Sequence, residues 1–124
     1  MIKRKNYSAL GLPVGPYVHA VEHNGVLHVS GLTAFGSAAQ GRNMSQQAEA
    51  ILLSLKQIAS EEGVTLASLL KVTVFVTHLT ELAELRAVLS RHYGDNPPAS
   101  SLVQVAGLFS PEVNIEIEAQ LAVG

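Results

Sequence analysis

Two carboxylates near the C-terminus are spaced so that both could face one ligand. Glu116 and Glu118 stand two residues apart in a run that alternates apolar and polar side chains. In a strand both would project from the same face, about 7 Å apart. On an exposed face they would be ordinary solvated carboxylates, so the spacing alone leaves a chemical role open.

The other polar residues that could do chemistry give weaker signals. The five histidines, at positions 19, 23, 28, 78 and 92, lack the spacing of a metal-ligand set, so no metal is expected. Ser30 lacks the glycine two places before it that a nucleophile elbow needs, whereas Gly31 could let a ligand approach the backbone. Tyr17 could present its hydroxyl to a cavity or could only pack.

Arg86 is the unusual residue in a stretch with helical periodicity. At 100° per residue it falls about 40° from Leu82 and on the same side as Tyr93, at the edge of the apolar stripe. A guanidinium there must extend to solvent along its aliphatic stem, pair with a carboxylate, or hold an anion. Periodicity alone favours the first of these.

The composition predicts one small domain, residues 1–124, that buries part of its surface in subunit contacts. The chain is 48% hydrophobic and only 15% charged, against about 25% charged residues in an average soluble protein. A net charge of -2 gives no field that would attract nucleic acid, and no apolar run approaches the ~20 residues of a membrane span. The absence of cysteine excludes disulfides and thiolate nucleophiles, and a cytoplasmic location is the default expectation.

Sequence patterns in the first half predict a hairpin and a helix. Two β-branched runs, 18–22 and 26–32, flank His23-Asn24-Gly25, and Asn-Gly is a strong signal for a tight antiparallel turn. A helix should follow, with Asn43 as its N-cap and Gly63 at its end. Residues 66–70 could add one further helical turn.

The second half predicts a strand, a helix and two more strands. "KVTVFVTH", residues 71–78, should be a central strand covered on both faces. Thr80 is a plausible N-cap for a second helix that Gly94 ends. Runs 101–106 and 113–123 should be strands, the latter with strict alternation. This order fits an α+β two-layer domain with both helices on one side of a mixed sheet.

Four segments together resemble the YjgF/RidA family, the Rid proteins: "GPYVHAVEHNGVLHVSGLTA", "LLKVTVFVTHLTELAELRAVL", "PPASSLVQVAGL" and "VNIEIEAQLAV". The likeness spans nearly the entire chain, in order. It implies a chorismate-mutase-like α+β protomer and a homotrimer with three small-metabolite clefts at the subunit interfaces. Such a trimer would account for the low charge content.

The resemblance also implies an activity and its residues. RidA-type members hydrolyse reactive enamines and imines such as 2-aminoacrylate to a 2-oxo acid and ammonia, without a cofactor. An arginine holds the substrate carboxylate and a glutamate positions or activates the attacking water. Tyr17, Ser30, Gly31 and Glu116 match cleft positions of the family, with Glu116 as the catalytic glutamate.

The arginine does not carry over. The family's usual proline-alanine-arginine-x-cysteine segment reads Pro98-Ala99-Ser100-Ser101-Leu102 here, which puts Ser100 in place of the arginine. Losing a charge-assisted contact costs roughly 1.5 to 3 kcal/mol of binding. Arg86 occupies a helix position that is commonly asparagine in the family. Either Arg86 supplies the charge by another route beside Ser100, or the cleft takes a neutral or differently shaped ligand.

Three functions follow from these residues. The first is an enamine or imine deaminase whose substrate-binding residues include Tyr17, Ser30, Gly31, Arg86 and Ser100. The second is a non-catalytic trimeric module that binds or senses a small molecule, which the loss of the arginine favours. The third is an endoribonuclease, attributed to some family members. It is disfavoured because the chain is slightly acidic and has no basic face studded with aromatic residues.

Overall fold

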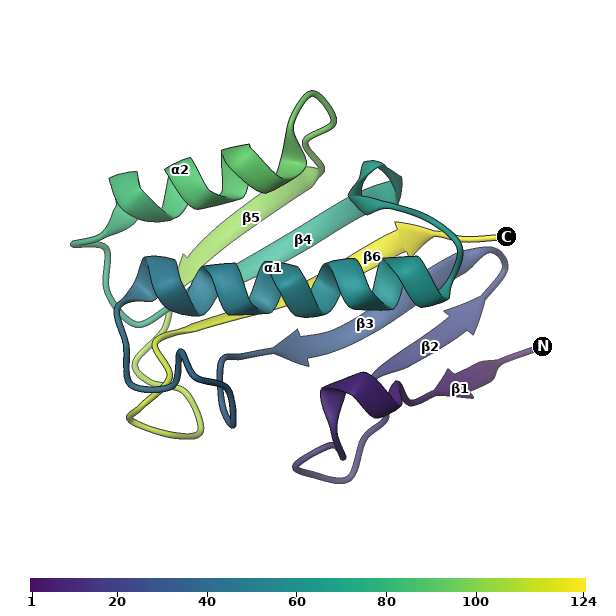
Figure 1. Cartoon of the computed structure of the whole chain (residues 1–124), viewed down its shortest axis with the longest axis horizontal. Coiled ribbons are helices and arrows are strands. Elements are labelled where there is room, and N and C mark those ends of the chain that lie inside the picture. The colour runs from purple at the N-terminus through teal and green to yellow at the C-terminus, as the bar shows by residue number, and fades with distance from the viewer.

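Two helices cover one face of a six-stranded mixed sheet (Figure 1). The computed structural model describes all 124 residues. The elements in chain order are β1 (Lys3–Lys5), the 3₁₀ helix η1 (Ser8–Leu10), β2 (Ala20–His23), β3 (Val26–Leu32), α1 (Met44–Glu61), the 3₁₀ helix η2 (Leu66–Ser68), β4 (Leu69–Val76), α2 (Leu82–Tyr93), β5 (Ala99–Gln104) and β6 (Ile115–Ala122). The predicted α+β two-layer class is therefore confirmed.

The strand order is β1-β2-β3-β6-β4-β5, which places the C-terminal strand in the middle of the sheet. All neighbours are antiparallel except β4 and β5, which run parallel through the α2 crossover. The register between β3 and β6 shifts between Val29 and Leu32. Ser30 and Gly31 lie in this irregularity, so their backbone departs from the regular ladder at one end of the sheet.

Backbone geometry at the glycine turns confirms the predicted hairpin and both helix ends. Asn24 and Gly25 have φ values of 51° and 76°, as a tight hairpin between β2 and β3 requires. Gly63 has a φ of 76° just beyond α1, and Gly94 has a φ of 59° at the end of α2. Glycine adopts these left-handed conformations without the steric cost of a Cβ atom.

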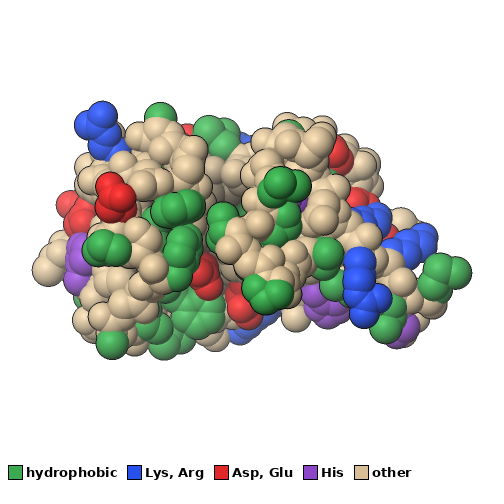
Figure 2. All heavy atoms as spheres, turned by 90° about the horizontal axis from the view of Figure 1, so that it is seen from below, with side chains coloured by type: hydrophobic (Ala, Val, Ile, Leu, Met, Phe, Trp, Pro, Cys, Tyr) green, Lys and Arg blue, Asp and Glu red, His purple; other side chains and the backbone are tan.

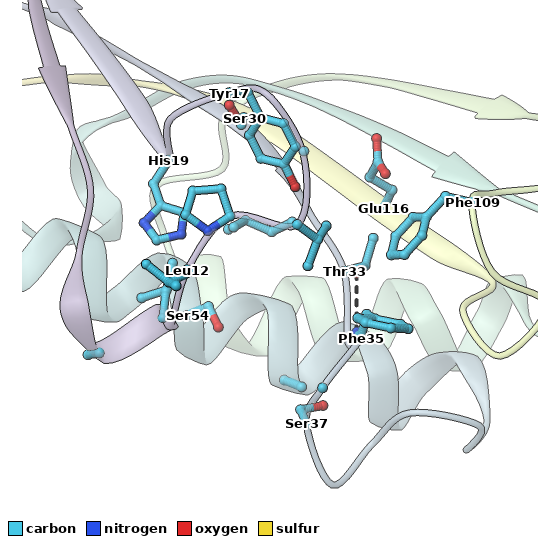
Figure 3. A pocket seen from close by; sticks show the side chains of 18 residues that line it. Leu12, Tyr17, His19, Ser30, Thr33, Phe35, Ser37, Ser54, Phe109 and Glu116 are labelled. Carbon is cyan, nitrogen blue, oxygen red and sulfur yellow. Dashed lines mark hydrogen bonds between the residues drawn. The ribbon is translucent and has the colours of Figure 1, made fainter.

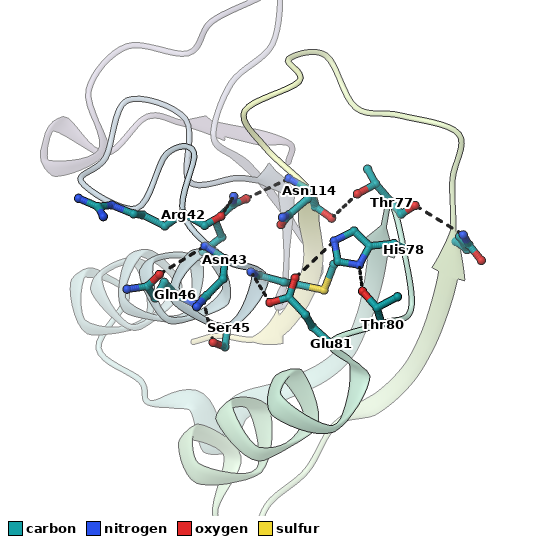
Figure 4. A network of polar contacts seen from close by, with 12 residues as sticks. Arg42, Asn43, Ser45, Gln46, Thr77, His78, Thr80, Glu81 and Asn114 are labelled. Atoms are coloured by element: carbon teal, nitrogen blue, oxygen red, sulfur yellow. Dashed lines mark hydrogen bonds and ion pairs between the residues drawn. The ribbon is translucent and has the colours of Figure 1, made fainter.

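The two helices begin differently. Asn43 caps α1, since its side chain accepts from the Gln46 backbone N–H while Gln46 bonds back to Asn43. The expected Thr80 cap of α2 is wrong. The Thr80 hydroxyl is hydrogen-bonded to His78 Nδ1 at 2.8 Å, and the residue before the helix is Glu81 (Figure 4).

Glu81 joins the starts of both helices instead of capping its own. Its Oε1 accepts from the backbone N–H of Met44, the first residue of α1, at 3.1 Å. Its Oε2 lies 3.4 Å from His78 Nε2 (Figure 4). A carboxylate at a helix N-terminus is favoured by the unpaired backbone donors there, so Glu81 stabilises α1.

The hydrophobic core lies between α1 and the sheet. Alternate residues of β6 are buried, from Ile115 to Leu121, as the strict alternation of this strand predicts. Val72, Val74 and Val76 of β4 are fully buried on the same face. The opposite face of the sheet carries no helix (Figure 1).

Leu52→Ala should lower the free energy of unfolding by about 2–5 kcal/mol, because it leaves a cavity in a close-packed core. Leu52 is fully buried in α1, whereas the adjacent Leu53 is 55% exposed. Leu53→Ala makes the same chemical change on the same helix and should change stability by less than about 0.5 kcal/mol. Urea denaturation of both variants measures the difference, and equal losses would contradict the assignment of the helix face.

The β5 edge is exposed along its whole length in a single protomer. All six of its residues are exposed, including Leu102 at 37% and Val103 at 42%. An exposed apolar edge strand tends to pair with or be covered by another chain.

None of the helices is both long and apolar enough to cross a membrane.

Candidate functional site

The irregular end of β3 is held firmly by the strand before it. The Ser30 backbone N–H donates to the His19 carbonyl at 2.9 Å, and the Ser30 hydroxyl donates to the Val18 carbonyl at 2.7 Å. The hydroxyl proton is therefore used to fix the backbone. Ser30 positions Gly31 and does not have the free, base-paired hydroxyl of a serine nucleophile.

The carboxyl group of Glu116 lies directly against Gly31. A Cβ atom added at Gly31 would stand 2.5 Å from Glu116 Oε2 and 2.7 Å from its Cδ, closer than real Cβ contacts allow. The absence of a side chain at position 31 thus makes room for the carboxyl. This is the close approach that a glycine in a strand permits.

The surroundings of the Glu116 carboxyl disfavour its charged form. Partial burial raises its pKa above the ordinary glutamate value, and the charge of Glu118 raises it further. It makes no hydrogen bond or ion pair with any other residue of the protomer. Both oxygens are therefore available to a ligand or a water molecule.

Glu116 opens into a cavity of about 720 Å³. Its lining residues are Ala9, Leu10, Leu12, Pro13, Val14, Tyr17, His19, Ser30, Gly31, Leu32, Thr33, Phe35, Gly36, Ser37, Ala50, Ser54, Phe109 and Glu116. They come from the segment before β2, the end of β3 and the loop after it, the middle of α1, the loop before β6 and β6 itself (Figure 3). Glu116 is the one charged residue among them, so the protomer places no cation in the cavity.

Apolar side chains surround the mouth of the cavity. Phe35 and Phe109 pack edge to face with ring centroids 5.1 Å apart, and both remain about half exposed. Tyr17 is 44% exposed and Leu12 90% exposed. Figure 2, viewed from below, shows hydrophobic side chains around a hollow in the surface, with acidic side chains visible near it. Such a mouth suits a ligand that carries apolar surface.

The protomer brings four of the six predicted site residues together. Tyr17, Ser30, Gly31 and Glu116 all line the cavity. Arg86 is exposed on α2 and pairs with no carboxylate, and Ser100 is exposed on the β5 edge. Neither Arg86 nor Ser100 lines the cavity of its own subunit.

Sequence reasoning missed three residues that shape the cavity: His19, Phe35 and Phe109. The sequence offered His19 only as a candidate metal ligand. In the structure, no group of three or more His, Cys, Asp or Glu side chains lies close enough together to hold a metal ion. Phe35 and Phe109 lie in loops, outside any periodic element. The available signal was that two of the chain's three phenylalanines stand in stretches that contain glycine.

Comparisons with known proteins agree with this architecture. Residues 8–123 match the family model described as endoribonuclease L-PSP. A RutC family protein of Pasteurella multocida is 35% identical over 112 residues, covering 86% of this chain and 86% of that protein. The mitochondrial protein MMF1 of Saccharomyces cerevisiae is 31% identical over 108 residues, covering 85% of this chain and 72% of that protein.

A solved structure gives the same result for the fold. The crystal structure of RidA from the Antarctic bacterium Psychrobacter sp. PAMC 21119 superposes with a TM-score of 0.80 at 29% identity. The match covers 90% of this chain and 92% of that one. The family model, over residues 8–123, includes the strands that carry Gly31 and Glu116.

Proposed function

The chain belongs to the endoribonuclease L-PSP family, the YjgF/RidA proteins, and from this premise we propose that it hydrolyses reactive enamines and imines. The products are a 2-oxo acid and ammonia, with 2-aminoacrylate as the type substrate. The observation that carries the proposal is the Glu116 carboxyl, which is half-buried, free of protein partners and the one charge in the cavity. Such a group can take a proton from water and later return it.

The proposed reaction needs one proton-transfer group and one water molecule. The enamine first takes a proton from solvent at its terminal carbon, which gives the iminium ion. Water then adds to the carbon of the protonated C=N bond while Glu116 accepts a proton from it, which gives a neutral carbinolamine. Glu116 returns this proton to the nitrogen, the C–N bond breaks and ammonia leaves, and Glu116 accepts the remaining hydroxyl proton as the carbonyl forms. A raised pKa favours both steps, because Glu116 must act first as base and then as acid.

The direct test generates 2-aminoacrylate with a pyridoxal-phosphate-dependent lyase and follows pyruvate release. Purified protein should accelerate the release over buffer and over a protein blank of equal concentration. An unchanged rate would rule out this reaction.

We further propose that the working form is a homotrimer. The fully exposed β5 edge and the uncovered sheet face support it, since both would be covered by neighbouring subunits. Light scattering coupled to gel filtration should give three times the 13.1 kDa of the chain. A monomeric mass at micromolar concentration would contradict this assembly.

Arg86 is proposed as the group that holds the substrate carboxylate, with Ser100 beside it, both delivered from a neighbouring subunit. Arg86→Ala should then raise KM about 10- to 100-fold, the loss of a charge-assisted contact worth roughly 1.5 to 3 kcal/mol. Lys56→Ala, which removes an unpaired exposed cation from α1, is the matched control and should leave KM unchanged. An unaltered KM in Arg86→Ala would exclude Arg86 from the site and favour a neutral ligand.

The pH dependence follows from the raised pKa of Glu116. The ionised form is the base, so kcat/KM should fall as pH drops through a pKa higher than that of an ordinary glutamate. Glu118→Gln removes the neighbouring charge that contributes to the shift, so the acid limb of the profile should move to lower pH. A pH profile of both proteins measures this, and a limb that stays in place would mean that another group titrates.

A non-catalytic module that binds a small metabolite is the second candidate. Ser100 in place of the family arginine and a protomer cavity without a cation favour it. Thermal shift and calorimetry would then show binding of a small molecule without turnover. Ribonuclease activity, which the name of the family model carries, is least favoured because the cavity and the chain are both slightly acidic.

For location, we propose the cytoplasm, and a chain without cysteine is compatible with such a reducing compartment. The name of the Saccharomyces relative places that protein in mitochondria. Fractionation of the source cells separates the two, and recovery with an organelle would contradict the cytoplasmic location.

A further inference from the structure

His19 is a buried histidine that the proposed reaction does not use. The residue is only 6% exposed, yet it lines the cavity. Figure 3 shows it beside Leu12 and Ser54, on the opposite side of the cavity from Glu116, with Tyr17 between them. A buried polar ring at this place is costly unless its nitrogens have partners.

One ring nitrogen of His19 has a partner that fixes the position of its proton. The Tyr7 backbone N–H donates to His19 Nδ1 at 2.9 Å. Since Nδ1 accepts, it carries no hydrogen, and the neutral ring must carry its proton on Nε2. Burial lowers the pKa of His19, which keeps the ring in this neutral form near neutral pH.

The orientation of the ring is fixed as well as its tautomer. It stacks on the Tyr7 ring, with centroids 6.0 Å apart and planes at 15°. The Tyr7 hydroxyl donates to Glu62 at 2.8 Å, and Lys5 in turn pairs with Glu62 at 2.8 Å. The His19 backbone N–H donates to Asn6 at 3.0 Å. These contacts hold the Nε2–H in one direction.

The second ring nitrogen has no partner in the protein. His19 Nε2 makes no hydrogen bond and is not enclosed among the buried unpaired atoms, so it is open to the cavity. It is the one side-chain N–H donor among the lining residues. Two lining hydroxyls, those of Ser30 and Ser37, already donate to backbone carbonyls. The Nε2–H is thus a rigid donor with no structural use.

We propose that His19 determines ligand specificity by donating its Nε2–H to an oxygen at the far end of the ligand's side chain. This rests on the proposed function, in which the reacting carbon lies at Glu116. The part of the site that one protomer forms, a cavity of about 720 Å³, exceeds what a three-carbon enamine needs, and 9 of its 18 lining residues are hydrophobic. The preferred ligands are imines, and the 2-oxo acids formed from them, with an apolar or aromatic body that ends in an oxygen.

Two substitutions separate this role from a structural one. His19→Asn places an amide oxygen near the position of Nδ1, so it can still accept from the Tyr7 N–H, but nothing replaces Nε2. His19→Gln reaches the position of Nε2 with an amide N–H and gives up the contact with Tyr7. If His19 is only structural, the Asn variant should behave more like the wild type than the Gln variant does. If His19 binds ligand, the Gln variant should keep more of the wild-type ligand preference than the Asn variant does.

The probes are phenylpyruvate and 4-hydroxyphenylpyruvate, which differ by one terminal hydroxyl. Wild type should bind the hydroxylated probe about three- to tenfold more tightly, the value of one additional hydrogen bond. His19→Asn should bind both probes equally, with the affinity for phenylpyruvate unchanged. His19→Gln should keep most of the preference. In NMR spectra of wild type, the Nε2 proton of His19 should shift with 4-hydroxyphenylpyruvate and not with phenylpyruvate.

Three results would overturn the proposal. They are equal affinities in wild type, a preference that survives in His19→Asn, and failure of both probes to bind at millimolar concentration. Calorimetry measures these affinities without turnover. A protein that shows the preference but hydrolyses no imine would support the role of His19 and contradict the proposed function. A protein that hydrolyses imines without the preference would support the proposed function and contradict the role of His19.

Discussion

Glu116→Gln should lower the rate of 2-aminoacrylate hydrolysis by about 10²- to 10⁴-fold, the usual contribution of a positioned acid–base group. Glutamine has nearly the same shape, so it can occupy the space that Gly31 leaves for the carboxyl. It cannot accept and return a proton. Pyruvate release in the coupled lyase assay measures the loss, which should appear in kcat.

The fold should survive this substitution. Burial disfavours the charged form of Glu116, so a neutral amide there should leave the free energy of unfolding unchanged or slightly raise it. Glu84→Gln is the matched control, because Glu84 is exposed on α2 and forms no ion pair. A Glu116→Gln protein with more than about a tenth of wild-type activity would show that another group moves the proton.

The sequence was sufficient for most of the fold because the signals were local. The Asn24-Gly25 turn, the Asn43 cap and the alternation of β6 each reflect contacts between residues close in the chain or a simple period. β1 was missed because its sequence, Lys-Arg-Lys, has no apolar alternation. It is stabilised by pairing with β2 and by the ion pairs of Lys5 with Glu22 and Glu62.

The predicted Thr80 cap failed for a related reason. A threonine before an apolar helical stripe is a good N-cap signal, but the hydroxyl can also bond a neighbouring side chain. Here His78 takes the hydroxyl, and Glu81 bonds across to Met44 at the start of α1. The Met44 N–H that Glu81 accepts from lies 37 residues away from Glu81 in the chain, so no local sequence pattern predicts this contact.

The site was only partly accessible from sequence. Family resemblance indicated Gly31 and Glu116. In the structure the Glu116 carboxyl occupies the space that a side chain at position 31 would fill. His19 could not be found by periodicity, because its importance depends on Tyr7, which lies 12 residues away. The roles of Arg86 and Ser100 stay predictions, since both depend on a second subunit.

Gly31→Ala should reduce activity by about 10²-fold, because a displacement of about 1 Å in a catalytic group can cost this much. The added methyl group would collide with the Glu116 carboxyl at 2.5 Å. The atom that must move is the end of a flexible side chain, so the free energy of unfolding should fall by no more than about 1 kcal/mol. Gly107→Ala, at a glycine with no atom within 4 Å of the added Cβ, should leave both quantities unchanged.

Gly31→Ala and Glu116→Gln, combined in one protein, test whether Gly31 acts through Glu116. If its only role is to make room for the carboxyl, adding Gly31→Ala to Glu116→Gln should cost little further activity, since residues that act as a unit are not additive. Independent losses that multiply would mean instead that Gly31 contacts the ligand through its backbone. Single-turnover rates of the two single variants and the double variant distinguish these cases, and the second outcome would move the substrate closer to the β3 backbone than to the Glu116 side chain.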